Sequence, residues 1–250
     1  MGEAIIREDK NGVATLFLNR PEKLNALNVE LFTLLEAQVD KIAAQTETVG
    51  LVIVRGAGRC FSAGNDLSDI AAGKGLPRPN FQGQIIEKLA NLPQPVISAV
   101  HGHCYTGGLE LALAGDIIFA SEGAKFGDTH GKWAMAPIWG MSQRLPRRVG
   151  TYKAREMMFT SKTYSGTEAA SFGLANMVVP DEDFDAELDK LAAGIVANSW
   201  FSHRANKKLL IETDGLPLSA GLAHEVFRGQ GRGPDMEERI AGGFGSKAKA

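Results

Sequence analysis

The chain has 250 residues, a hydrophobic fraction of 44%, a charged fraction of 22% and a formal net charge of −2. This length can bury a large core, and the composition is ordinary for a globular protein of one domain or of a core with a small appendage. A net charge so close to neutral argues against nucleic acid as the main partner.

Sequence features also limit the cellular compartment that we expect. The two cysteines, Cys60 and Cys104, provide no disulfide framework and indicate a reducing compartment. Residues 1–10 carry too little apolar length for a signal peptide, and no apolar run approaches membrane-spanning length. We therefore expect a cytoplasmic protein without a membrane partner.

The first half of the chain alternates short apolar runs with helical patterns, which predicts a mixed α/β fold. Asn28 is a suitable N-cap for a helix with apolar residues at helical spacing as far as Ile42. Residues 71–80 are rich in glycine and proline and predict a mobile loop, and a helix over roughly 81–91 ends before Pro93. Strands are predicted over residues 13–18, 51–55, 96–100 and 116–120.

From Thr151 onward the pattern is helical. Asp181 is a candidate cap for a helix that carries Phe184 and Leu188 on its apolar face. The basic pairs Arg147-Arg148 and Lys207-Lys208 are interpreted as solvated helix faces. Helices are predicted over residues 151–160, 167–172, 181–198, 201–213, 218–229 and 234–242.

Two glycine-bearing loops are the most informative part of the chain. Phe61-Ser62-Ala63-Gly64-Asn65-Asp66-Leu67 follows the strand over 51–55, and residues 101–111, which include Gly107-Gly108, follow the strand over 96–100. Glycine lets backbone N–H groups approach a ligand closely and permits a positive φ. Two such loops side by side would aim two amide hydrogens at one oxygen, which is how an oxyanion hole is built. The alternative is that these glycines serve tight turns only.

Glu110 falls about one helical turn beyond Gly107 and is flanked by Leu109 and Leu111. A carboxylic acid in an apolar pocket has a raised pKa, which suits proton exchange near neutral pH. The alternative is an exposed helix glutamate, the usual situation of this residue type. Its position behind the glycines favours a role as general acid or base.

The segment His101-Gly102-His103-Cys104 contains residue types that bind metals. Three ligands so close together on one strand-to-loop segment fit a tetrahedron poorly, and a fourth is not evident. We therefore predict no metal site.

The ordered motifs resemble the enoyl-CoA hydratase/isomerase (crotonase) superfamily. One glycine turn alone would be weak support, but a series in the correct order and spacing is specific. The resemblance implies an α/β fold: a crotonase-like spiral of ββα turns over residues 1–195, which holds the CoA and active sites. It also implies a C-terminal helical region over residues 196–250 for oligomerisation, as a homotrimer or a hexamer (a dimer of trimers), and for covering the CoA site. Besides the two loops, the resemblance rests on Leu18-Asn19-Arg20-Pro21, Leu24-Asn25-Ala26-Leu27, Asp116-Ile117-Ile118, Phe126-Gly127, Pro137 to Leu145 and Gly173-Leu174-Ala175.

The resemblance also assigns catalytic roles. The oxyanion-hole donors would be the backbone N–H groups of Asn65 and Gly107, and Glu110 matches the first of two catalytic glutamates. His130 stands in the place of the second glutamate, which departs from the family's pattern. A histidine can position a water or carry a proton. It can also serve only as a hydrogen-bonding residue of its loop, and both interpretations stay open, with Asp128 as a further candidate carboxylate.

Contacts to coenzyme A follow from the same resemblance. For a lysine among them, the alternative is a solvated surface charge. Four aromatic or sulfur-containing residues either line the acyl pocket or fill the core, namely Phe81, Trp133, Met135 and Trp139. The implied CoA contacts are Lys23, Leu24, Asn25, Ala26 and Ala63, together with Phe244 and Lys247 near the C-terminus.

The family's chemistry implies an enzyme acting on acyl-CoA thioesters. The main prediction is a hydro-lyase of fatty acid metabolism that hydrates a 2-enoyl-CoA to a 3-hydroxyacyl-CoA through a thioester enolate. It would need no separate cofactor, because coenzyme A enters as part of the substrate. The missing second glutamate leaves open double-bond isomerisation, or C–C bond formation or cleavage, centred on Glu110. A non-catalytic CoA-binding scaffold is a third possibility, against which the presence of Glu110 argues.

Overall fold

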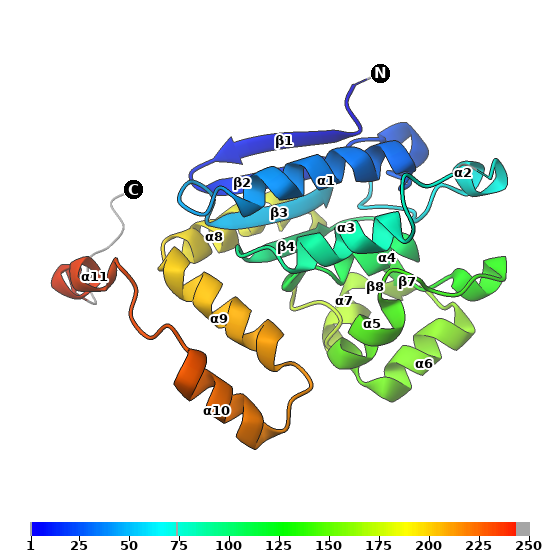
Figure 1. The fold of residues 1–250 in the computed structure, drawn as a ribbon. Helices are drawn as coiled ribbons and strands as arrows, with labels where there is room; N and C mark the ends of the chain where they lie inside the picture. Colours follow the sequence, from blue (N-terminus) through cyan, green and yellow to red (C-terminus); the bar gives the residue numbers. More distant parts are fainter. Residues whose placement is uncertain (1, 74, 244–250) are drawn as a thin grey trace.

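The strands of the computed structural model, which describes residues 2–73 and 75–243, form two sheets (Figure 1). The larger sheet has the strand order β1-β2-β3-β4-β6-β9, and the smaller has the order β5-β7-β8. The larger sheet consists of β1 (Ile5–Lys10), β2 (Val13–Leu18), β3 (Leu51–Gly56), β4 (Val96–Val100), β6 (Ile117–Ser121) and β9 (Met177–Val179). The smaller consists of β5 (His103–Tyr105), β7 (Lys125–Gly127) and β8 (Tyr164–Ser165).

Parallel pairing places the two glycine-bearing loops next to each other. In the larger sheet β2, β3, β4, β6 and β9 run parallel, and only β1 is antiparallel to its neighbour. Because β3 and β4 are hydrogen-bonded in parallel, the loops that follow them leave the same edge of the sheet. Isolated bridges from Leu27 to Asn65 and from Ser62 to Cys104 then fix the first loop between its neighbours.

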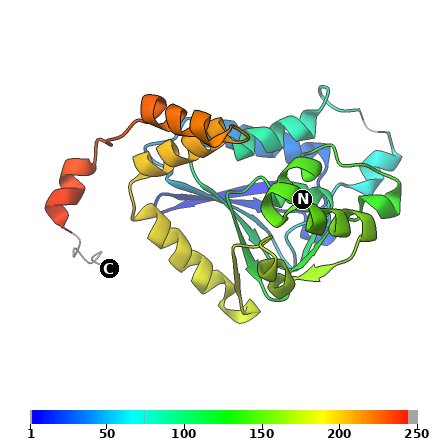
Figure 2. The same ribbon diagram turned by 90° about the horizontal axis from the view of Figure 1, so that it is seen from below.

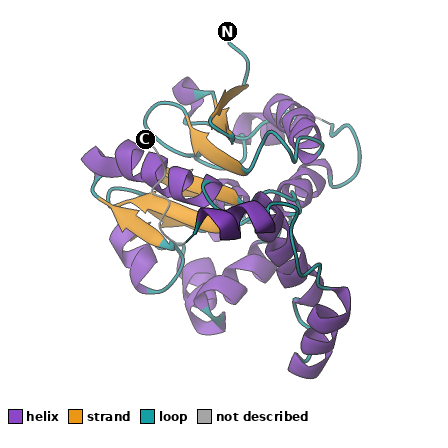
Figure 3. Cartoon of the chain, turned by 90° about the vertical axis from the view of Figure 1, so that its left-hand side faces the viewer, coloured by secondary structure: helices purple, strands orange, loops and turns teal. Residues whose placement is uncertain are grey.

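Helices cover both faces of the larger sheet (Figures 2 and 3). One face packs its buried residues, such as Val52 and Val54, in the same core as α1 (Val29–Ala43) and α3 (Phe81–Ala90). The other face, with Leu51 and Ile53, packs against α8 (Phe184–Val196). Burial on both faces explains why β3 and β4 appear in the sequence as continuous apolar runs and not as alternating patterns.

The remaining helices follow the chain around this core. None of the helices in the described residues is long and apolar enough to span a membrane. The last two helices, α10 and α11, extend away from the sheets (Figure 1). These remaining helices are α2 (Leu67–Ala71), α4 (Gly107–Ala112), α5 (Met141–Val149), α6 (Thr151–Thr160), α7 (Gly166–Ser171), α9 (Trp200–Thr213), α10 (Leu218–Arg228) and α11 (Met236–Gly242), with short 3-10 turns η1 (Pro21–Lys23), η2 (His130–Trp133) and η3 (Asp181–Asp183).

The predicted helices are confirmed, with one local error. Asn28 caps α1 by accepting a hydrogen bond from the N–H of Leu31. Asp181 does not cap α8, because residues 181–183 form η3 and α8 starts only at Phe184. The Asp181 carboxylate instead accepts a hydrogen bond from the backbone N–H of Gly123, at 3.2 Å.

Two of the basic side chains predicted to be solvated are not. Lys207 is buried, and its Nζ lies 2.7 Å from Oδ2 of Asp116 and 3.0 Å from the carbonyl oxygen of Gln94. Arg148 is half-buried and donates hydrogen bonds to backbone carbonyl groups, including that of Leu174. The prediction of a solvated side chain was therefore wrong for Lys207 and Arg148, and Lys207 attaches α9 to the sheet. The other member of each basic pair, Arg147 or Lys208, is exposed as expected.

Candidate active site

The backbone N–H groups of Asn65 and Gly107 meet where the two loops adjoin. A Cβ atom placed on Gly107 would lie 3.2 Å from the nitrogen of Asn65, and one on Gly64 would lie 3.3 Å from the nitrogen of Gly107. Within residues 2–73 and 75–243, neither N–H group donates a hydrogen bond. Two unpaired amide donors so close together are what an oxyanion hole requires.

Unusual backbone conformations aim these two amides. Gly64 has a φ of 101°, and a Cβ there would lie only 2.8 Å from the carbonyl oxygen of Tyr105. Thr106 has φ 50° and ψ −111°, a region that residues with a side chain seldom occupy. Its hydroxyl is hydrogen-bonded to the hydroxyl of Thr129 and also accepts a hydrogen bond from the backbone N–H of Thr129. These two contacts hold the turn in place. Thr106 was not predicted as a site residue, because its strain is visible only in the backbone.

Buried polar side chains fix the first loop. The side-chain amide of Asn25 donates to the carbonyl oxygen of Cys60 at 2.7 Å, and the hydroxyl of Ser62 donates to the carbonyl oxygen of Asn25 at 2.8 Å. The same hydroxyl accepts the N–H of Gly64 at 3.1 Å. The loop therefore holds its shape without a ligand, as a preorganised oxyanion hole should.

Glu110 is 2% exposed and lies in the first turn of α4. Its Oε1 accepts hydrogen bonds from the backbone N–H groups of Trp139, at 2.9 Å, and Met141, at 3.2 Å. Burial raises the pKa of this carboxyl group, and the two hydrogen bonds offset only part of the rise. The alternative of an exposed helix glutamate was therefore wrong, and Glu110 has the properties of a general acid or base.

His130 lies beside Glu110, with its Nε2 at 3.7 Å from the free Oε2 of that residue. Its Nδ1 is 2.6 Å from Oδ1 of Asp128. Burial alone would lower the pKa of His130, but the hydrogen bond to Asp128 and the charges of Asp128 and Glu110 raise it overall. Glu110 and His130, two side chains that can each carry a proton, therefore lie side by side, although only one of them is a glutamate.

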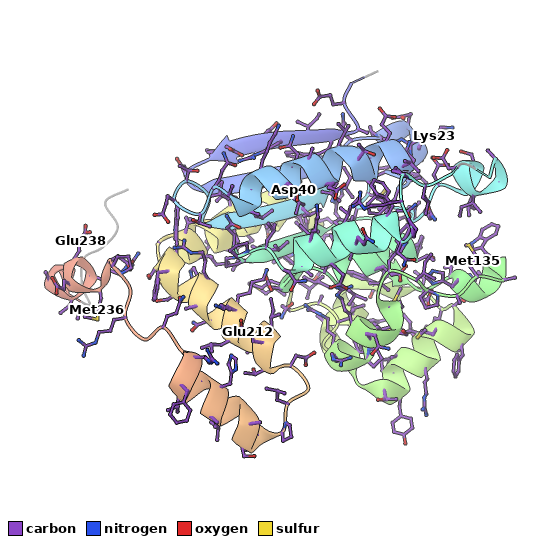
Figure 4. The ribbon with its side chains drawn as sticks, in the orientation of Figure 1. Lys23, Asp40, Met135, Glu212, Met236 and Glu238 are labelled. Atoms are coloured by element: carbon purple, nitrogen blue, oxygen red, sulfur yellow. The ribbon has the colours of Figure 1, made fainter. Side chains whose placement is uncertain are left out.

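Two cavities meet at the candidate oxyanion hole, and Asn65, Thr106 and Met135 line both. The inner cavity has a volume of about 310 Å³ and contains Glu110 and His130. Its other walls are mainly apolar and include Ile70, Ala136, Ile138 and Trp139. The outer cavity, of about 550 Å³, is lined by Lys23, Ala26, Ala63 and Trp133, among others. Figure 4 shows Lys23 and Met135 on the same side of the molecule.

Comparison with known proteins agrees with this geometry. The sequence matches the enoyl-CoA hydratase/isomerase family over residues 8–227. The chain belongs to this family. A probable peroxisomal enoyl-CoA hydratase 1 from Arabidopsis thaliana is 34% identical, and the match covers 95% of this chain and 92% of the relative. The 1,2-epoxyphenylacetyl-CoA isomerase of Escherichia coli is 33% identical, with 96% and 95% covered.

A solved structure confirms the crotonase-like fold of this family member. The crystal structure of an enoyl-CoA hydratase from Bacillus anthracis superimposes with a TM-score of 0.88 at 31% identity, and covers 96% of this chain and 95% of that one. A crotonyl-CoA hydratase from Syntrophomonas wolfei is 35% identical over 82% of this chain and 80% of its own length. The family thus includes both hydratases and an isomerase among the relatives of this chain.

Five of the seven CoA contacts implied by the family lie in the described residues, and three of these five line the outer cavity. Lys23, Ala26 and Ala63 line it. Leu24 does not, but its carbonyl oxygen accepts the N–H of Ala63 at 2.9 Å and so joins the two segments. Asn25 is fully buried and serves the loop. The two C-terminal candidates, Phe244 and Lys247, lie outside the described residues.

The candidate acyl-pocket residues separate into two groups. Met135 and Trp139 line the inner cavity, and Trp133 lines the outer one. Phe81 lines neither; it is 2% exposed and packs in the main core. The alternative that these residues fill the core therefore holds for Phe81.

Residues of the segment His101-Gly102-His103-Cys104 make other interactions in place of metal ligation. Nε2 of His101 lies 2.8 Å from the carbonyl oxygen of Gly58, and Cys104 is fully buried in the main core. Across the described part of the chain, no three His, Cys, Asp or Glu residues are grouped so as to hold a metal ion. The absence of a metal from the active protein stays a prediction.

Proposed function

We propose that this protein adds water to a 2-enoyl-CoA and forms a 3-hydroxyacyl-CoA. The observation that supports this most is the pair of Glu110 and His130 beside two unpaired backbone N–H groups. Hydration needs a base for water and an acid for the α carbon, whereas moving a double bond needs only one proton shuttle. With Oε2 of Glu110 and Nε2 of His130 3.7 Å apart, one water can bond to both atoms.

The chemical steps follow from these positions. The thioester oxygen would accept hydrogen bonds from the N–H groups of Asn65 and Gly107 and would carry the negative charge of the enolate. Loss of one such donor typically costs about 3 kcal/mol of transition-state stabilisation. One member of the pair takes a proton from water while the other gives a proton to the α carbon. The pair must therefore hold one proton at the start of each turnover.

The outer cavity would hold the coenzyme A part of the substrate. Lys23 would contact a phosphate group, and Ala26 and Ala63, which line the same cavity, would contact adenine and pantetheine. Phe244 and Lys247 remain candidates for closing this site from the C-terminus. No further cofactor is needed for the reaction, and a cytoplasmic location is part of the proposal.

A panel of acyl-CoA substrates followed by mass spectrometry tests this proposal. A hydratase adds the mass of water, an isomerase leaves the mass unchanged, and C–C chemistry gives fragments or adducts. The isomerase among the relatives makes the second outcome the main alternative. Tight CoA binding with no turnover of any thioester would support a scaffold protein and would contradict the proposal.

We predict that His130 is visible in the pH dependence of kcat/KM. The doubly protonated pair lacks a base and the fully deprotonated pair lacks an acid, so the profile should be bell-shaped. Because the pKa of His130 is raised, the alkaline limb should lie above the ordinary imidazole value of about 6.5. His130→Gln should remove this limb, and His130→Glu should restore two carboxyl groups and retain hydration.

The profile is measured by initial rates on a short enoyl-CoA over a range of pH. An unchanged rate and an unchanged profile in His130→Gln would make His130 a bystander. Isomerisation, or another reaction that uses Glu110 alone, would then become the better proposal.

We also predict a homotrimer, or a hexamer built from two trimers. Helix α10 exposes apolar side chains at helical spacing, with Leu218 79% and Val226 76% exposed and Leu222 between them, and the adjacent Phe227 is 82% exposed. A monomer in water does not commonly leave so much apolar surface uncovered. Light scattering at micromolar concentration should give three or six times the chain mass, and Val226→Glu should reduce it. A monomer mass for the unaltered protein would refute this prediction.

A further inference from the structure

Asp128 lies behind His130 and does not line either cavity. Its side chain is 1% exposed. One carboxylate oxygen, Oδ1, is 2.6 Å from Nδ1 of His130 and also accepts the backbone N–H of His130, at 3.1 Å. A single buried oxygen thus holds both the main chain and the ring of the same histidine.

This contact determines which ring nitrogen carries the hydrogen. An ionised carboxylate can only accept hydrogen bonds, so Nδ1 of His130 must be the donor. In a neutral imidazole the other nitrogen, Nε2, is then left with a free lone pair. That nitrogen faces the inner cavity and Oε2 of Glu110. Asp128 therefore prepares His130 to accept a proton from a group in the cavity.

The hydrogen bonds of Glu110 likewise determine which of its two oxygens can carry a proton. Its Oε1 is occupied by two backbone N–H donors, from Trp139 and Met141. A proton on this carboxyl group must then reside on Oε2, the oxygen that faces His130 and the cavity. Burial of the side chain favours this protonated form. When the single proton of the pair is on Oε2, the pair presents an acid on Glu110 and a base on His130.

We propose that Asp128 is a positioning residue that sets the direction of proton transfer during hydration. Nε2 of His130 takes a proton from water as the water oxygen bonds to C3 of the enoyl group, and the π electrons move to the thioester oxygen. The enolate then takes the proton of Glu110 at the α carbon. The imidazolium finally returns its proton to the Glu110 carboxylate, which restores the pair. This inference rests on the proposed hydratase function.

The charged groups that act on the His130 ring are Asp128 and Glu110. Helix α6 packs against η2, and just after α6 the Ser161 hydroxyl, an uncharged group, adjoins Gly131. Asp128 raises the pKa of His130 and also that of Glu110. Its removal should therefore shift both limbs of the pH profile of kcat/KM to lower pH.

Asp128→Asn tests the proposal in the full-length protein with crotonyl-CoA. Asparagine has no negative charge to stabilise the imidazolium form of His130, although its carbonyl oxygen can still accept both N–H groups. We expect kcat to fall by about a hundredfold or more, the scale of general acid–base catalysis, with little change in KM. Both limbs should shift to lower pH, and Asp128→Glu should recover part of the rate. Asp40→Asn, which removes an exposed carboxylate on α1, is the control and should not change these quantities.

A double-mutant cycle separates positioning from simple support of the loop. If Asp128 acts through His130, adding Asp128→Asn to His130→Gln should cause almost no further loss of kcat. Multiplied losses, or a lower kcat with unshifted pH limbs, would overturn the role of Asp128. Absence of hydration by the unaltered protein would instead overturn the proposed function, so the two failures can be told apart.

Discussion

Glu110→Gln is expected to lower kcat for hydration by at least about a hundredfold, the scale of a lost general acid. The variant should fold normally, because a glutamine oxygen can still accept the N–H groups of Trp139 and Met141. Its affinity for coenzyme A should be retained, since Glu110 does not line the outer cavity. Initial-rate kinetics on crotonyl-CoA measure kcat, and calorimetric titration with free coenzyme A measures the affinity.

The stability of this variant should also depend on pH in a defined direction. The folded-state pKa of Glu110 is raised, so the protonated form stabilises the fold. That contribution is complete below the ordinary carboxyl pKa and is lost as the pH rises through the folded value. Glutamine does not ionise, and therefore the Tm of Glu110→Gln should exceed that of the unaltered protein increasingly as the pH rises.

Two further variants complete this test. Glu110→Ala leaves two buried N–H groups without an acceptor and should lower the Tm, since each unsatisfied group costs about 1–3 kcal/mol. Glu30→Gln, on the exposed start of α1, should change neither activity nor Tm. Near-normal turnover of every accepted substrate by Glu110→Gln would remove Glu110 from the mechanism.

Gly107→Ala is expected to lower kcat and kcat/KM together by about a hundredfold or more, which is the effect of removing one oxyanion-hole donor. The added methyl group would lie 3.2 Å from the nitrogen of Asn65, the other proposed donor. It would also lie 2.4 Å from Cζ3 of Trp139, whose ring is buried against Phe32 and has little room to move. The hole would therefore be displaced or blocked.

Gly194→Ala is the matched control for this substitution. Gly194 lies on the exposed side of α8, and an added methyl group there meets no atom within 4 Å. It should leave the rate unchanged and slightly raise the Tm, because alanine favours the helix. A Gly107→Ala protein with normal kcat would show that the amides of Asn65 and Gly107 do not bind the reacting oxygen.

The sequence predicted those parts of the site that follow from strands and glycines. The continuous apolar runs of β3 and β4 indicated two buried strands, each followed by a glycine-bearing loop. The parallel pairing of these strands, which the structure adds, sets the loops with Asn65 and Gly107 side by side. The resemblance added Glu110 and His130. The contact between these two side chains could not be predicted, because it depends on how η2 lies against α4.

The features that the sequence did not predict depend on tertiary contacts. The donors that orient Glu110 are backbone groups of Trp139 and Met141, and a backbone N–H has no residue signature. Helix α5 contains Pro146, a residue that ordinarily ends a helix. Strand β1 is charged because it lies at the edge of the sheet with one side exposed. Lys207 is buried only because Asp116 and a carbonyl group satisfy it.

The most direct test of the account is the reaction of crotonyl-CoA in isotopically labelled water. If Glu110 and His130 add water across the double bond, the product should gain one labelled oxygen at C3 and one solvent hydrogen at the α carbon. Glu110→Gln and His130→Gln should each suppress both incorporations. A product that gains solvent hydrogen but no oxygen, with the double bond moved and the mass otherwise unchanged, would contradict hydration and establish isomerisation.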